Sequence, residues 1–152
     1  MVVNHGGEFN MIYIANFIYG FMCTVGFAVI FNSRKSSLVK AGLGGGIGWA
    51  THFIINHNFQ SVVISTFVAS LVIALLGEIF AVIDKQPATL YIIPGIVPLV
   101  PGFGLYYTML SLLEQNYNSA LQHGIETILI AILIAAALTI ILSINTYRKQ
   151  RR

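Results

Sequence analysis

The sequence has 152 residues, of which 57% are hydrophobic and 9% are charged. Because a soluble domain carries about a quarter charged residues, this composition excludes an ordinary soluble domain and indicates a single transmembrane domain, residues 1–152. The formal net charge is +3. Nucleic-acid binding is nevertheless not indicated, because all eight basic residues lie in short connections or at the ends of apolar runs: Arg34, Lys35, Lys40, Lys85, Arg148, Lys149, Arg151 and Arg152.

Five apolar segments approach or exceed the roughly 20 helical residues that are needed to cross a bilayer core. In chain order they cover 11–31, which has no charged residue; 38–56, which is rich in glycine; 62–83, which holds one acidic residue; 89–113, which holds three prolines; and 125–147, which precedes a basic tail. The sequence therefore predicts an all-α integral membrane bundle of about five transmembrane helices.

The basic residues also predict the orientation in the membrane. Arg34 and Lys35 lie in the first connection with Lys40 at its edge, Lys85 lies in the third, and the remaining four basic residues follow the last segment. The N-terminal segment and the connections "NHNFQ" and "EQNYNSALQHG" contain no Lys or Arg. Since short cytoplasmic loops carry the excess of basic residues, we expect the N-terminus outside and the C-terminus in the cytoplasm.

The fourth segment contains the stretch "YIIPGIVPLVPGFGLYY", residues 91–107, in which three prolines and three glycines interrupt an apolar sequence. A proline inside a helix removes a backbone hydrogen bond and costs roughly 3 kcal/mol. Irregular backbone at membrane depth is tolerated only where protein buries it or where it lines a wet cavity. We interpret the stretch as a broken transporter helix. The alternative is a kinked helix whose freed backbone groups are satisfied by neighbouring helices.

A broken helix exposes backbone hydrogen-bonding groups near the middle of the membrane. Its second half, expected to begin around 104–105, would present N–H groups and the positive end of its dipole to a substrate carboxylate. The two tyrosines after the break could line the same pathway, although aromatic residues at this depth more often serve packing. The predicted substrate-binding residues are Pro94, Gly95, Pro98, Pro101, Gly102, Gly104, Tyr106 and Tyr107.

The sequence "IIPGIVPLVPGFGLYYTM", after an acidic residue in the preceding segment, resembles the signature of the threonine/serine exporter family. The chain is similar to the small split subunits that correspond to the C-terminal half of the fused exporters. The resemblance implies a multi-pass protein of a bacterial-type cell (inner) membrane that needs a second membrane subunit of the other half-type. It also implies export of threonine and serine, or of a dicarboxylate such as succinate, and leaves both substrates open.

Four ionisable side chains are candidates for ion coupling or for the pathway, because a charge inside the bilayer costs roughly 2.5–3.5 kcal/mol. Glu78, in the third segment, is expected to exchange a proton or a cation. The alternative is a protonated or hydrogen-bonded Glu78 packed between helices. Glu126 and His123 lie close together in the fifth segment, where they could pair at the outer mouth. His52, near the outer end of the second segment, could gate the pathway or simply lie at the interface.

Glycines in the second segment are spaced four residues apart, as in closely packed membrane helices. The two pairs predict helix packing, within the subunit or against a partner, rather than substrate contact. These residues are Gly42, Gly44, Gly46 and Gly48.

Together these features predict one membrane subunit of a two-component secondary exporter for small hydrophilic acids, driven by the proton-motive force. A passive channel formed by an oligomer and a structural membrane partner without its own pathway are the alternatives. The sequence has no zinc-like Cys/His spacing, no phosphate-binding loop and no nucleophile–base pair. We therefore expect no metal, no cofactor and no enzymatic activity.

Overall fold

The computed structural model describes the backbone of residues 5–150 and the side chains of residues 11–144. Every regular element within these residues is helical, which confirms the predicted all-α fold. The elements are α1 (His5–Ile30), α2 (Lys35–Phe59), α3 (Val62–Asp84), α4 (Thr89–Ile96), the short 3-10 helix η1 (Val97–Leu99), α5 (Gly102–Leu113) and α6 (Tyr117–Gln150).

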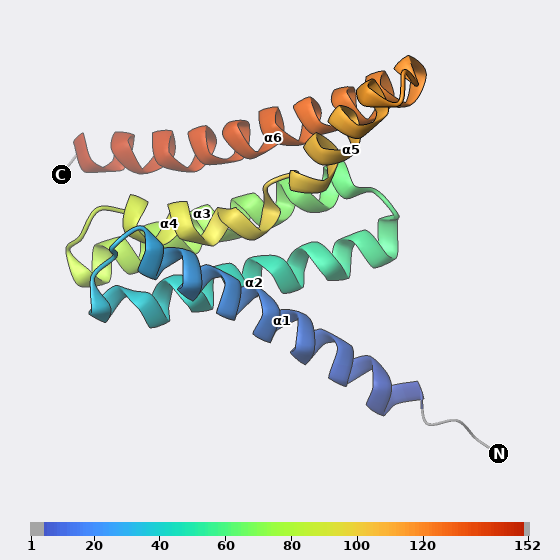
Figure 1. Ribbon diagram of the computed structural model, residues 1–152. Coiled ribbons are helices and arrows are strands. Elements are labelled where there is room, and N and C mark those ends of the chain that lie inside the picture. The colour runs from blue at the N-terminus through green and yellow to red at the C-terminus, as the bar shows by residue number, and fades with distance from the viewer. Residues whose placement is uncertain (1–4, 151–152) are drawn as a thin grey trace.

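Successive segments run in alternating directions, with α4, η1 and α5 together forming one of them (Figure 1). The α1–α2 connection, the α3–α4 connection and the end of α6 therefore lie at the same end of the molecule. We call this the basic end, because Arg34, Lys35 and Lys85 lie in or beside these connections. The α2–α3 and α5–α6 connections lie at the opposite end.

Three helices of the described chain are long and apolar enough to cross a membrane: Met11–Ile30, Val62–Asp84 and Tyr117–Ile144. The fourth candidate is the pair Thr89–Leu99 and Gly102–Leu113, which bends by 45° at the break. This pair confirms the predicted broken helix. That α2 crosses the membrane stays a prediction. Its length of 25 residues supports the crossing, but its many glycines and polar ends make it less apolar than the three helices named above.

The connections at the end opposite the basic end are shorter than the polar sequence suggests. Most of "EQNYNSALQHG" belongs to α6, which begins at Tyr117. Gln115 adopts a left-handed conformation with φ 59°, and the side-chain oxygen of Asn116 accepts a hydrogen bond from the N–H of Ser119 at 3.3 Å. This pattern is an N-cap, so the polar residues after it form the first turns of a helix.

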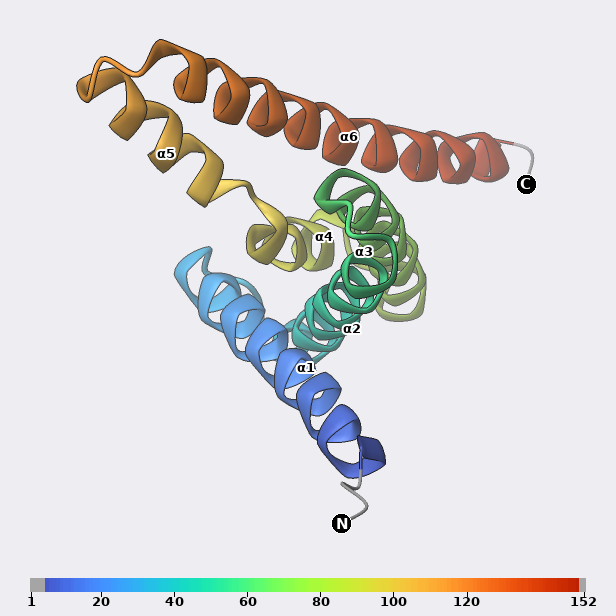
Figure 2. The ribbon, with the colours of Figure 1, turned by 90° about the vertical axis from the view of Figure 1, so that its right-hand side faces the viewer.

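Helix α2 packs against α1, α3 and α4 through its glycines. A Cβ atom on Gly42 would lie 2.7 Å from the Phe21 ring of α1, and one on Gly48 would lie 2.3 Å from Cγ1 of Ile73 on α3. By contrast, α5 packs mainly against α6, and the two form a hairpin that extends away from α1 (Figure 2). The bundle is therefore tight around α2 and more open beside α5.

Candidate functional site

The break in the fourth segment lies between η1 and α5. Pro94 is buried inside α4 and does not end that helix. Pro98 lies in η1, and Pro101 occupies the N-cap position of α5. The second half begins at Gly102, two residues before the position expected from the sequence.

A cavity of about 320 Å³ lies beside this break. Its walls come from α2, α3, η1, α5 and α6, so that segments far apart in the sequence meet there. The predicted site residues that line it are His52, Pro98, Pro101, Gly102, Gly104, Tyr107, His123 and Glu126.

The α5 wall is the first turn of that helix, and its backbone N–H groups are only partly hydrogen-bonded. The N–H of Gly102 donates to the Val100 carbonyl at 2.7 Å, and the N–H of Leu105 donates to the Pro101 carbonyl at 3.2 Å. No side chain caps this helix, and within the described residues the N–H groups of Phe103 and Gly104 have no hydrogen-bond partner. The first N–H groups of a helix carry partial positive charge, so this wall favours an anionic group.

The α6 wall is fixed to α5 by a close contact between Gly104 and Thr127, where a Cβ on the glycine would lie 2.1 Å from the threonine Oγ1. The Thr127 hydroxyl donates to the His123 carbonyl at 2.7 Å. The ring centroids of His123 and Tyr107 are 5.7 Å apart. The described residues show no hydrogen bond or ion pair between His123 and Glu126, so the pairing expected from their spacing is absent.

The α2 wall holds His52 against Trp49, with ring centroids 5.3 Å apart and an interplanar angle of 12°. The indole Nε1–H of Trp49 donates to Oδ1 of Asn16 on α1 at 3.2 Å. This hydrogen bond links α1 to α2 and orients the aromatic pair at the edge of the cavity. Within the described chain, no group of three or more His, Cys, Asp or Glu side chains could hold a metal ion.

Sequence reasoning missed several lining residues, because they become neighbours only in the folded chain. Trp49 is the only tryptophan in the sequence, and Thr127 follows a candidate acid directly. These features alone could have suggested the two residues as neighbours of the site. No feature of the sequence around Thr66 of α3 suggests that it lies near the site. The further lining residues are Trp49, Val62, Thr66, Leu99, Val100, Phe103, Thr127 and Ile130.

Four predicted site residues lie elsewhere. Pro94 and Gly95 are buried, with a Cβ on Gly95 lying 3.0 Å from Cγ2 of Ile73. Tyr106 lines a neighbouring cavity of about 530 Å³, whose other lining residues also line the first cavity. Glu78 lies in a separate groove of about 330 Å³, whose other lining residues are aliphatic side chains of α3 and α6. Glu78 therefore does not line the cavity beside the break.

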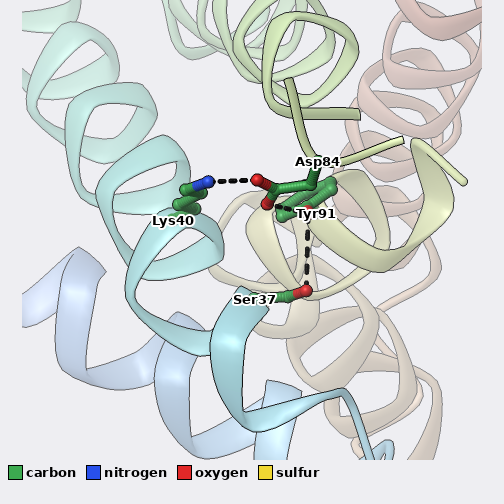
Figure 3. Close-up of polar contacts among 4 residues, drawn as sticks. All are labelled: Ser37, Lys40, Asp84 and Tyr91. Carbon is green, nitrogen blue, oxygen red and sulfur yellow. Dashed lines mark hydrogen bonds and ion pairs between the residues drawn. The ribbon is translucent and has the colours of Figure 1, made fainter. Parts of the chain in front are cut away.

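A polar cluster at the basic end joins three helices (Figure 3). Lys40 of α2 forms a salt bridge with Asp84 at the end of α3. The Tyr91 hydroxyl of α4 donates to the second Asp84 oxygen at 2.5 Å and accepts from the Ser37 hydroxyl at 3.4 Å. Lys85 follows Asp84 directly in the sequence, but the folded chain pairs Asp84 with Lys40. The cluster ties α2, α3 and α4 together at the end away from the cavity.

Residues 16–144 match the family model described as "Threonine/Serine exporter, ThrE". The match covers most of the chain and includes every residue that lines the cavity. No solved structure matches the chain significantly.

Proposed function

This chain belongs to the threonine/serine exporter family, and we propose that it is one membrane subunit of a two-component secondary exporter for small hydrophilic acids. Family membership implies a role in threonine/serine export by a membrane transporter rather than an enzyme. The observation that carries the proposal is the cavity beside the broken segment, where free backbone N–H groups meet polar side chains of three other helices.

The substrate carboxylate would bind at the start of α5. The N–H groups of Phe103 and Gly104 supply two donors, and the α5 dipole adds a favourable field. Discontinuous helices of secondary transporters use their half-helix N-termini in this way for anionic substrate groups. Binding would also satisfy backbone groups whose exposure at membrane depth is costly.

A second subunit is proposed because this chain leaves the break poorly covered. The Phe103 side chain is 81% exposed and that of Tyr106 is 61% exposed. Ser111 is the only buried residue of α5. Since irregular backbone does not face lipid directly, protein from another subunit is expected to cover this side. The resemblance to split exporters supports a subunit of the other half-type as that partner.

The proposed energy source is the proton-motive force, and two acids are candidates for the coupling group. Glu126 lines the cavity, so a proton that it binds or releases would act directly on the bound substrate. Glu78 lies in another groove, so coupling through it would require movement of α3 or α6. Both roles stay predictions. The cavity position favours Glu126.

The proposed location is the inner membrane of a bacterial-type cell, with the basic end in the cytoplasm and the N-terminus outside. The gathering of Arg34, Lys35 and Lys85 at one end of the helices supports this orientation, because basic residues are enriched in cytoplasmic loops.

The test is efflux from cells that are preloaded with labelled threonine, serine or succinate. The cells would express this chain alone, its candidate partner alone, or both. Efflux only with both subunits would support the two-component exporter and identify the substrate. Equal efflux from the partner alone would assign this chain a structural role, and efflux from this chain alone would contradict the two-component arrangement.

A further inference from the structure

We propose that Glu126 selects the substrate by binding an ammonium group, so that the cavity accepts amino acids and discriminates against carboxylates that lack an amine. This inference rests on the proposed function, because it assumes that the substrate occupies the cavity beside the break. It gives Glu126 a role in substrate recognition that a general position in the pathway does not imply.

The position of Glu126 follows from its neighbour. Thr127 is 5% exposed and packs directly against Gly104 of α5. This contact fixes how α6 faces the first turn of α5, and Glu126 precedes the contact by one residue along α6. Both Glu126 and Gly104 line the same cavity. A substrate held at the α5 N-terminus therefore shares its cavity with the Glu126 carboxyl.

The hydroxyl groups of Thr66 and Thr127, which also line the cavity, already donate their protons to backbone carbonyls. Thr127 donates its proton to the His123 carbonyl at 2.7 Å, and Thr66 donates its proton to the Val62 carbonyl at 2.7 Å. A hydroxyl has one proton and two lone pairs, so each threonine has used its proton and keeps only acceptor lone pairs. Glu126 adds a carboxylate to the cavity lining, an acceptor that suits an ammonium group, because an ammonium nitrogen only donates.

The α5 wall has the complementary character. Its free N–H groups at Phe103 and Gly104 are donors and suit a carboxylate. Among the residues that line the cavity in the described chain, Glu126 is the only Asp, Glu, Lys or Arg. One wall therefore suits the negative group of an α-amino acid and another suits its positive group.

The same charge disfavours other acids. A second carboxylate placed near Glu126 would be repelled by its charge. A hydroxy acid without an amine would remove water from Glu126 without placing a cationic donor there, and sites built for a hydrogen-bonding group reject analogues that lack that group. Threonine and 3-hydroxybutanoate isolate this effect, because they share the carboxylate and the hydroxyl and differ in the amine.

The experiment measures ligand-induced shifts of the unfolding temperature for the purified chain, co-expressed with its candidate partner. Threonine, 3-hydroxybutanoate and succinate are titrated separately, since the shift as a function of ligand concentration gives an apparent Kd. The variants are Glu126→Gln, which removes the charge, and Glu126→Asp, which keeps it. Glu114→Gln is the matched control, because Glu114 lies after α5 and does not line the cavity.

We expect the unmodified protein and Glu114→Gln to bind threonine about 100-fold more tightly than 3-hydroxybutanoate, and Glu126→Gln to reduce this ratio below about tenfold. Glu126→Asp is expected to keep a preference for threonine. If Glu126→Gln leaves the ratio of the two affinities unchanged, or weakens the binding of threonine and 3-hydroxybutanoate equally, Glu126 does not select the amine. Either result would leave the cavity as the binding site. If no ligand shifts the unfolding temperature of the unmodified protein, the result would instead contradict the proposed function.

Discussion

Gly104 of α5 and Thr127 of α6 are in such close contact that a Cβ atom on the glycine would lie 2.1 Å from the threonine Oγ1. The Thr108 hydroxyl donates to the Gly104 carbonyl at 2.6 Å, so the glycine also takes part in the hydrogen bonding of α5. Both residues of the contact line the cavity. The packing of the α5–α6 hairpin and the shape of the candidate site therefore depend on the same pair.

We predict that Gly104→Ala destabilises the protein by about 1–3 kcal/mol, because the added methyl group overlaps Thr127 and forces a shift of α5 or α6. Thermal unfolding in detergent measures the change. Thr127→Ala should restore part of the lost stability in the double variant, since it removes the overlapping Oγ1. Gly102→Ala is the matched control, because a Cβ on Gly102 has no atom within 4 Å. Equal destabilisation by both glycine substitutions would refute this contact.

Two glycines of α2 are predicted to respond oppositely to alanine. Gly48→Ala should destabilise by about 1–3 kcal/mol, because its Cβ would lie 2.3 Å from Cγ1 of Ile73. Gly44→Ala should be neutral or stabilising by up to about 1 kcal/mol, since alanine is the better helix former and the nearest atom, on Phe80, is 3.9 Å away. Unfolding midpoints of the two variants check this prediction, and a destabilised Gly44→Ala would show that α2 packs differently or against a partner.

Tyr91→Phe is predicted to destabilise the protein by about 1–2 kcal/mol. The substitution keeps the buried ring, whose centroid lies 5.9 Å from that of Phe80, and removes the hydroxyl that joins Asp84 to Ser37. Ser37→Ala should add little in the Tyr91→Phe background, because its partner is already absent. Tyr106→Phe, at a ring that is 61% exposed, is the control. A Tyr91→Phe variant as stable as Tyr106→Phe would mean that the cluster contributes nothing to stability.

The orientation is tested by labelling single cysteines with a membrane-impermeant maleimide in intact cells. The background is Cys23→Ser, since Cys23 is the only cysteine. Gln60→Cys, in the α2–α3 connection, should be labelled from outside, whereas Gln86→Cys, in the α3–α4 connection, should react only after the cells are opened. The reverse pattern would invert the proposed topology, and labelling of both in intact cells would contradict a crossing by α3.

Hydrophobic length and the proline–glycine stretch were sufficient to predict the helices and the broken segment, because both depend on local sequence. The ends of the connections were less predictable. Asn116 caps a helix inside a polar sequence, and Pro94 continues α4 despite its missing N–H. In each case the outcome depends on one hydrogen bond or on tertiary packing, which hydropathy does not contain.

The site was predicted only in part for a similar reason. The sequence favours Glu78 as the coupling acid and gives Glu126 only a possible pairing with His123, yet Glu126 and not Glu78 lines the cavity beside the break. Glu78 lies twelve residues after Thr66 on α3, about 18 Å along the helix from the part of α3 that lines the cavity. Thr66 could not be identified, because nothing near it in the sequence marks it as a neighbour of the break.

The most direct test of the central claim compares Gly102→Leu with Gly26→Leu for efflux of labelled threonine from cells that also express the candidate partner. A Cβ at either glycine meets no other part of the subunit within 4 Å outside its own stretch of chain, but only Gly102 lines the cavity beside the break. If the substrate binds there, Gly102→Leu reduces efflux at least about tenfold at equal expression and stability, and Gly26→Leu keeps it. Undiminished efflux in Gly102→Leu would contradict the cavity as the substrate site.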